Sequence, residues 1–168
     1  MELQGMIQEL EKTLSVNIDL YDEMKQELEA ERDALKRRSM ADLERVVSRK
    51  SALALRIKML DESRLRTIEA LADRMKASAS ELTLSVLSDR LGGAMKTRLL
   101  ALRQRLRASV ESVTAMNEFN RGLIEKSMVI NYQAASRLHQ LIQPETTYEK
   151  KGSAGAKLGS GGVVNEKT

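Results

Sequence analysis

The chain has 168 residues, of which 42% are hydrophobic, 31% charged and only 2% aromatic, and it carries a formal net charge of +4. It contains no cysteine, so disulfides and thiolate metal sites are excluded. Few aromatic residues, one proline and abundant Leu, Ala, Glu, Lys and Arg favour long helices over sheets.

The first residues and the hydropathy pattern indicate where in the cell the protein is expected. The opening Met-Glu-Leu-Gln lacks the basic and apolar regions of a secretory signal. The longest uncharged helical run, residues 127–136, is well short of the ~18 apolar residues that a membrane span needs. We therefore expect a soluble, cytoplasmic protein.

Apolar residues spaced three or four apart predict a first helix over residues 2–37. Ser39 to Asp42 then resembles a capping box, with Asp in place of the usual Glu. A second helix is therefore expected over residues 40–79, after a tight reversal of the chain.

A Ser- and Thr-rich connector over residues 80–93 is expected to hold one helical turn near Ser88 and to stop at the glycine pair 92–93. The third helix is predicted over 93–142, because its apolar repeat is the most regular and Pro144 forbids its continuation. At 1.5 Å per residue, it outruns its neighbours by ~15–20 Å.

These elements predict an all-α fold: a long antiparallel three-helix bundle or coiled-coil hairpin with an extended C-terminal helix. The helical domain spans residues 1–143. The glycine-rich remainder, residues 144–168, is expected to be a flexible, disordered tail because it has too little apolar surface to order itself.

The far end of the third helix is the candidate binding surface. Between residues 117 and 143 charged residues are few, and apolar residues occupy more than one face of the predicted helix. A self-contained bundle helix has one apolar stripe with charges opposite it. The excess apolar surface therefore predicts a second protein as its cover.

Polar residues interrupt this apolar seam at Asn117, Asn120, Ser127 and Asn131. Asparagines in a helical seam can fix register or oligomeric state at a cost in stability. They can equally present amide groups to a partner, and the sequence leaves both roles open.

Charge is distributed unevenly along the chain. Residues 1–36 hold ten acidic and four basic groups, whereas residues 90–107 hold six basic groups and no acidic one. We favour pairing of the basic run with its acidic neighbour inside the bundle. Nucleic-acid binding is the alternative, but no aromatic or amide readout accompanies the basic run, so no nucleic-acid partner is expected.

Enzymatic chemistry has little support in the sequence. The sole histidine, His139, has no carboxylate or cysteine at ligand spacing, and Glu145 lies beyond Pro144. The segment 155–157 fails the phosphate-loop spacing and follows no strand. No enzyme, metal or cofactor is expected.

Several segments together resemble the FlgN family of flagellar type III export chaperones. The run from Glu31 to Leu53 is similar to the family's helix–loop–helix pattern "E-x-x-x-L…L-x-x-L-x-x-x-K-x-x-L". Residues 116–125, Met-Asn-Glu-Phe-Asn-Arg-Gly-Leu-Ile-Glu, resemble "L-N-x-x-N-x-x-L-L-E". Thr147 and Tyr148 resemble the start of a "T-x-Y-G-x-x-G" ending, although Glu149 replaces the glycine. The resemblance covers about residues 1–152.

The resemblance implies a cytoplasmic chaperone that holds hook–filament junction proteins before flagellar export, on a C-terminal helix that takes the helical ends of the substrate. It also implies that Tyr148 docks onto a component of the export gate. The expected substrate-binding residues share the third helix: Asn117, Asn120, Leu123, Ile124, Ser127, Met128, Ile130, Asn131, Ala134, Leu138 and Leu141. The alternative is a structural coiled-coil protein that forms homodimers or larger assemblies through the same apolar end.

Overall fold

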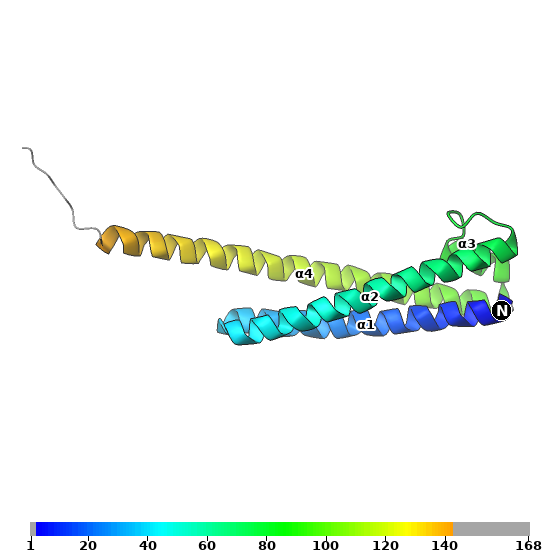
Figure 1. The fold of residues 1–168 in the computed structure, drawn as a ribbon, viewed down its shortest axis with the longest axis horizontal. Coiled ribbons are helices and arrows are strands. Elements are labelled where there is room, and N and C mark those ends of the chain that lie inside the picture. Colours follow the sequence, from blue (N-terminus) through cyan, green and yellow to red (C-terminus); the bar gives the residue numbers. More distant parts are fainter. Residues whose placement is uncertain (1–2, 143–168) are drawn as a thin grey trace, which may run out of the picture. The chain divides into compact units, whose positions relative to one another are not determined.

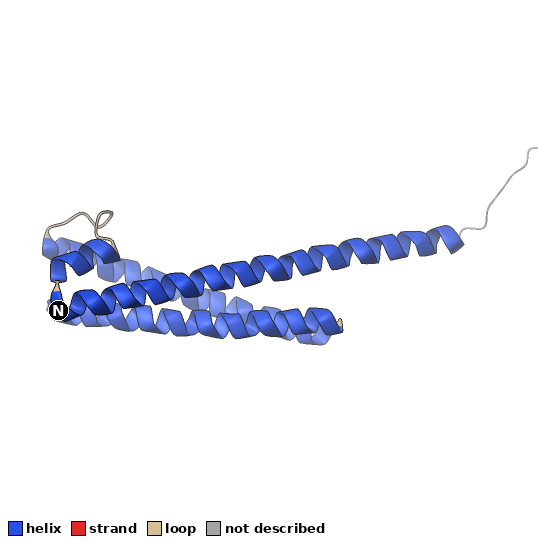
Figure 2. Cartoon of the chain, turned by 180° about the vertical axis from the view of Figure 1, so that it is seen from behind, coloured by secondary structure: helices blue, strands red, loops and turns tan. Residues whose placement is uncertain are grey.

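A computed structural model describes residues 3–142 of the chain, and every regular element in that range is a helix (Figures 1 and 2). The elements are α1 (Leu3–Arg37), α2 (Met40–Met75), the short α3 (Leu84–Leu91) and α4 (Gly93–Ile142). The predicted all-α class is confirmed. The chain divides into two compact units, residues 1–131 and 132–168, and α4 contributes residues to each. The predicted tail, residues 144–168, lies outside the described residues.

A tight reversal joins α1 to α2, which lie side by side and antiparallel (Figure 1). Arg38 takes a left-handed conformation with φ 55°, and the backbone N–H of Ser39 donates to the carbonyl of Ala34. The Ser39 side chain accepts from the backbone N–H of Asp42 at 3.4 Å, so the predicted N-cap is confirmed. The reciprocal half of a capping box is absent there, because the Ser39 N–H is used by Ala34.

The C-terminal end of α2 comes earlier than the expected residue 79. The helix ends at Met75 because Lys76 adopts the left-handed conformation and its N–H closes onto the carbonyls of Ala72 and Asp73. The N–H of Ala77 also bonds to Ala72, and this pair of bonds terminates the helix without a glycine.

The connector is more ordered than the single turn expected from its composition. Thr83 caps a two-turn helix, α3, by accepting from the N–H of Val86 at 3.2 Å. Leu87 is buried at its centre and Gly92, with φ 66°, ends it. Burial of the leucine outweighs the weak helix propensity of the surrounding Ser and Thr.

The core of the first unit forms two apolar clusters. The first cluster joins the start of α1, the end of α2, α3 and the start of α4: Met6, Ile7, Leu10, Leu14, Ile68, Leu71, Ala72, Leu82, Leu87 and Leu99. The second cluster joins the later part of α1 to α2, with Val113 and Met116 of α4 packed against it: Leu20, Met24, Leu28, Leu53 and Ile57. The short α3 therefore covers the first cluster but contributes nothing to the second.

Candidate functional site

A partly buried polar cluster, formed by Glu31, Lys50, Asn117 and Asn120, joins the three long helices. The Lys50 ammonium donates to both carboxylate oxygens of Glu31, at 2.9 and 2.8 Å, and reaches the Asn117 carbonyl oxygen at 3.4 Å. The Asn120 amide donates to the carbonyl of Leu28 at 2.8 Å and to Glu31 at 2.9 Å. Glu31 and Asn120 are buried. The two buried members of this cluster, Glu31 and Asn120, therefore both have hydrogen-bond partners within the chain.

This polar cluster marks the end of the packed part of α4. Only Leu99, Ser109 and Asn120 of α4 are fully buried, and no residue after Asn120 in the described range is. Asn120 is 2% exposed and both of its amide contacts lie within the chain. Of its two predicted roles, the geometry favours the fixing of helix register. Asn117, by contrast, is exposed.

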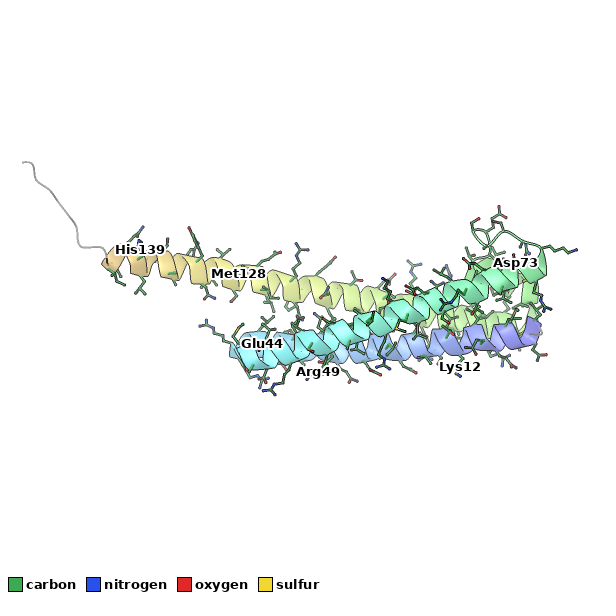
Figure 3. All side chains as sticks on the ribbon, in the orientation of Figure 1. Lys12, Glu44, Arg49, Asp73, Met128 and His139 are labelled. Carbon is green, nitrogen blue, oxygen red and sulfur yellow. The ribbon has the colours of Figure 1, made fainter. Side chains whose placement is uncertain are left out.

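Beyond this point the first unit presents an apolar helix surface to solvent. Leu123 and Ile124 are half-buried, whereas Ser127, Met128, Ile130 and Asn131 are exposed. Ile130 is 60% exposed although an isoleucine in a packed helix is usually covered. Figure 3 shows Met128 projecting from α4.

The part of α4 in the second unit is exposed along its whole described length, residues 132–142. The predicted binding residues Ala134, Leu138 and Leu141 are among them, and Leu141 is 83% exposed. Tyr132 and Ile142, which belong to the same predicted apolar stretch, are exposed as well. Tyr148 lies outside the described residues.

The predicted pairing between the basic run and the acidic first helix is realised by one contact. Arg98 reaches Glu11 at 3.4 Å, whereas Lys96 and Arg107 pair with acids outside α1. The acids of α1 are instead neutralised mainly from α2. The α2-to-α1 pairs are Arg49 with Glu27 at 2.8 Å, Lys50 with Glu31 at 2.8 Å, and Arg56 with Glu23 at 3.5 Å. The close packing of α1 against α2 explains this preference.

Two further observations concern chemistry and membranes. Within residues 3–142, no three His, Asp or Glu side chains come together in a way that could hold a metal ion. None of the helices in this range combines the length and the low charge that are needed to cross a lipid bilayer.

The described residues thus form a helical scaffold whose longest helix, α4, is held to α1 and α2 by the polar cluster and presents open apolar surface beyond it. The model of the FlgN family, described as "FlgN protein", matches residues 1–156. The chain belongs to this family, which is one of flagellar export chaperones and not of enzymes. Comparison with curated proteins and with solved structures yields no match.

The ion pair between Glu31 and Lys50 was not predicted, although both residues stand in the segment that resembles the family's helix–loop–helix pattern. The sequence nevertheless contains a pattern that indicates this pair. The tight turn at Arg38 makes α1 and α2 antiparallel, so an acid of α1 and a base of α2 that both occupy apolar seam positions near the turn indicate a buried pair.

Proposed function

We propose that this FlgN-family chain is a cytoplasmic export chaperone for hook–filament junction proteins. It binds the helical terminal segment of such a protein and delivers it to the flagellar type III secretion apparatus. The observation that carries the proposal is the run of exposed apolar side chains on α4 after Asn120.

The binding residues proposed on α4 are of two kinds. Apolar side chains supply affinity, at ~25 cal/mol per Å² of buried surface before the cost of association is subtracted. Polar side chains between them supply amide and hydroxyl groups that orient the partner helix. The set is Asn117, Leu123, Ile124, Ser127, Met128, Ile130, Asn131, Ala134, Leu138 and Leu141. Asn120 acts in the proposal by holding α4 in register.

A matched pair of substitutions tests the surface. Ile130 and Val129 are adjacent, β-branched and similarly exposed, at 60% and 55%. Only Ile130 falls on the same side of α4 as Leu123, because seven residues are close to two helical turns. We expect Ile130→Asp to weaken binding of the junction-protein segment about tenfold or more, and Val129→Asp to change it less than about threefold.

The measurement is isothermal titration calorimetry with the purified terminal segment of a junction protein, with circular dichroism as the control for helix content. Equal effects of the two substitutions would refute a seam-specific surface. A loss of helicity in step with the loss of binding would mean that Ile130 serves the fold instead.

Delivery to the export gate is proposed to involve Tyr148. Deletion of residues 147–168 should leave binding of the segment unchanged and reduce secretion of the junction protein in cells. A truncated chain that no longer captures the segment in a pull-down would contradict this division of roles.

The alternative function is self-association through the same apolar surface of α4. Sedimentation velocity separates the two: a stable homodimer at sub-micromolar concentration, unaffected by the junction-protein segment, would favour a structural coiled-coil protein.

A further inference from the structure

A second apolar surface lies within the first unit, in a groove between α2 and α4 above the second core cluster. The groove has a volume of 480 Å³ and opens to solvent. No carboxylate lines it, and Lys50 is its only charged residue. Its lining comes from all three long helices: Tyr21, Met24, Leu28, Val47, Lys50, Ser51, Ala54, Ile57, Val113 and Asn117.

The groove exists because the second cluster lacks the cover that the first cluster has. Leu82 and Leu87, before and within α3, are buried against the first cluster. No element within residues 3–142 does the same for the second cluster, so Val47 remains 48% exposed and Tyr21 and Val113 are half-buried. An amphipathic helix placed over the second cluster would pack against α1, α2 and α4 and complete a four-helix arrangement, as α3 does at the first cluster.

The α4 wall of the groove continues into one side of the proposed substrate-binding surface, the side that carries Ile124 and Met128. Val113, Asn117, Ile124 and Met128 follow one another at spacings of four, seven and four residues, so they share one side of α4. The first two line the groove, and the last two belong to the surface proposed to bind the export substrate. A helix laid along this side over residues 113–128 would extend about 22 Å.

We propose that the groove binds the end of the same substrate helix that α4 holds, an inference that rests on the proposed function. The occupant is an amphipathic helix with an apolar face for Met24, Leu28 and Ile57 and an acidic residue at its flank. Ser51 and Ala54 are small, so a helix backbone can approach α2 closely. Lys58, one turn beyond Ala54, is exposed and makes no ion pair within residues 3–142, so it is available to a carboxylate of the occupant.

The positions of the tyrosines allow a direct test. The chain has three, of which Tyr21 lines the groove and Tyr132 stands exposed on α4. Full-length chain labelled with 3-fluorotyrosine is titrated with the junction-protein terminal segment and followed by ¹⁹F NMR. The signals are assigned with Tyr21→Phe and Tyr132→Phe. We expect both signals to shift, with the same midpoint.

The other outcomes separate this inference from the proposed function. A shift at Tyr132 alone overturns the groove proposal and leaves the α4 surface standing. A shift at Tyr21 alone overturns the shared-helix geometry, and no shift at either position contradicts both proposals. A Tyr21 shift that follows the concentration of the chain without any segment would assign the groove to a second copy and overturn the inference.

Two exposed alanines of α2 provide matched variants. Ala54→Trp places an indole over the groove, whereas Ala52→Trp places it about 200° around the helix, away from the groove. We expect Ala54→Trp to lower affinity for the segment about tenfold and to remove the Tyr21 shift, and Ala52→Trp to stay within about twofold of the parent. Both variants should keep the parent's circular dichroism spectrum. Unchanged affinity and an unchanged Tyr21 shift in Ala54→Trp would overturn the proposal.

Discussion

Replacement of Asn120 by alanine is expected to destabilise the fold more than any other polar truncation on α4. The substitution removes hydrogen bonds of 2.8 Å to the Leu28 carbonyl and 2.9 Å to the buried Glu31 carboxylate. A neutral hydrogen bond contributes about 1 kcal/mol net, and one to a charged group about 1.5–3 kcal/mol. The expected loss of unfolding free energy is therefore about 2–4 kcal/mol.

Asn117 supplies the matched control, since it is the same residue type one turn earlier on the same helix. It is exposed and its one hydrogen bond, from Lys50, is long at 3.4 Å, so Asn117→Ala should cost less than about 0.5 kcal/mol. Urea titration followed by circular dichroism measures both. With an m-value of about 2 kcal/mol per M, the Asn120 variant should unfold at a urea midpoint about 1–2 M lower.

The result that would refute this reasoning is an equal, small cost for the two variants. If Asn120→Ala instead weakened binding of the junction-protein segment at unchanged stability, Asn120 would contact the partner and not hold the register of α4.

Three further predictions concern the turn, the polar cluster and α4. Lys50→Met should cost about 3 kcal/mol because it leaves the Glu31 carboxylate buried without a cation, and adding Glu31→Gln should recover part of that loss in urea titrations. A hydrogen bond with the Ser39 side chain lowers the pKa of Asp42 below its ordinary 3.8, so the ionised carboxylate stabilises the fold above that pH and its contribution is lost as the pH falls through the lowered value. Asp42→Asn should therefore unfold at a lower temperature than the parent at about pH 7, and the difference between the two should shrink in acid as the parent's carboxylate is protonated. Gly122→Ala should stabilise by about 0.5–1 kcal/mol in thermal unfolding, because a Cβ there meets no atom within 4 Å and alanine favours the helix; a destabilisation would point to an unseen close contact.

The long helices were predictable because each carries a continuous signal of apolar spacing, and the reversal between α1 and α2 because Ser39 is a good N-cap. The residue at which α2 ends, Met75, could not be predicted from the sequence. It depends on Lys76 in a left-handed conformation, which a lysine adopts rarely and which no neighbouring residue type indicates. The helical character of α3 was underestimated because burial of Leu87 decides it, and burial depends on contacts from α1 and α2.

In the candidate site, too, one feature could be predicted from the sequence and another depends on tertiary contacts. The sequence indicated an apolar excess after residue 117, and exposure of Met128, Ile130 and Leu141 agrees with that excess. It could not separate Asn117 from Asn120, although both stand beside the seam. Asn120 is buried because its amide reaches the Leu28 carbonyl, which is 92 residues away in sequence. Asn117 lies one helical turn earlier and does not reach that carbonyl.

Because every described α4 residue after Ile124 is exposed, this part of the helix should be only marginally stable in the free chain. A helix without tertiary cover depends on its own backbone hydrogen bonds, and isolated helices of about 15 residues are marginal in water. The amides of residues 125–142 should therefore exchange with solvent far faster than those of α1, and docking of a partner would freeze a fluctuating coil–helix equilibrium. Glycine placed at a solvent-facing position of this stretch would then lower affinity without touching the bound protein, purely through the entropy of ordering.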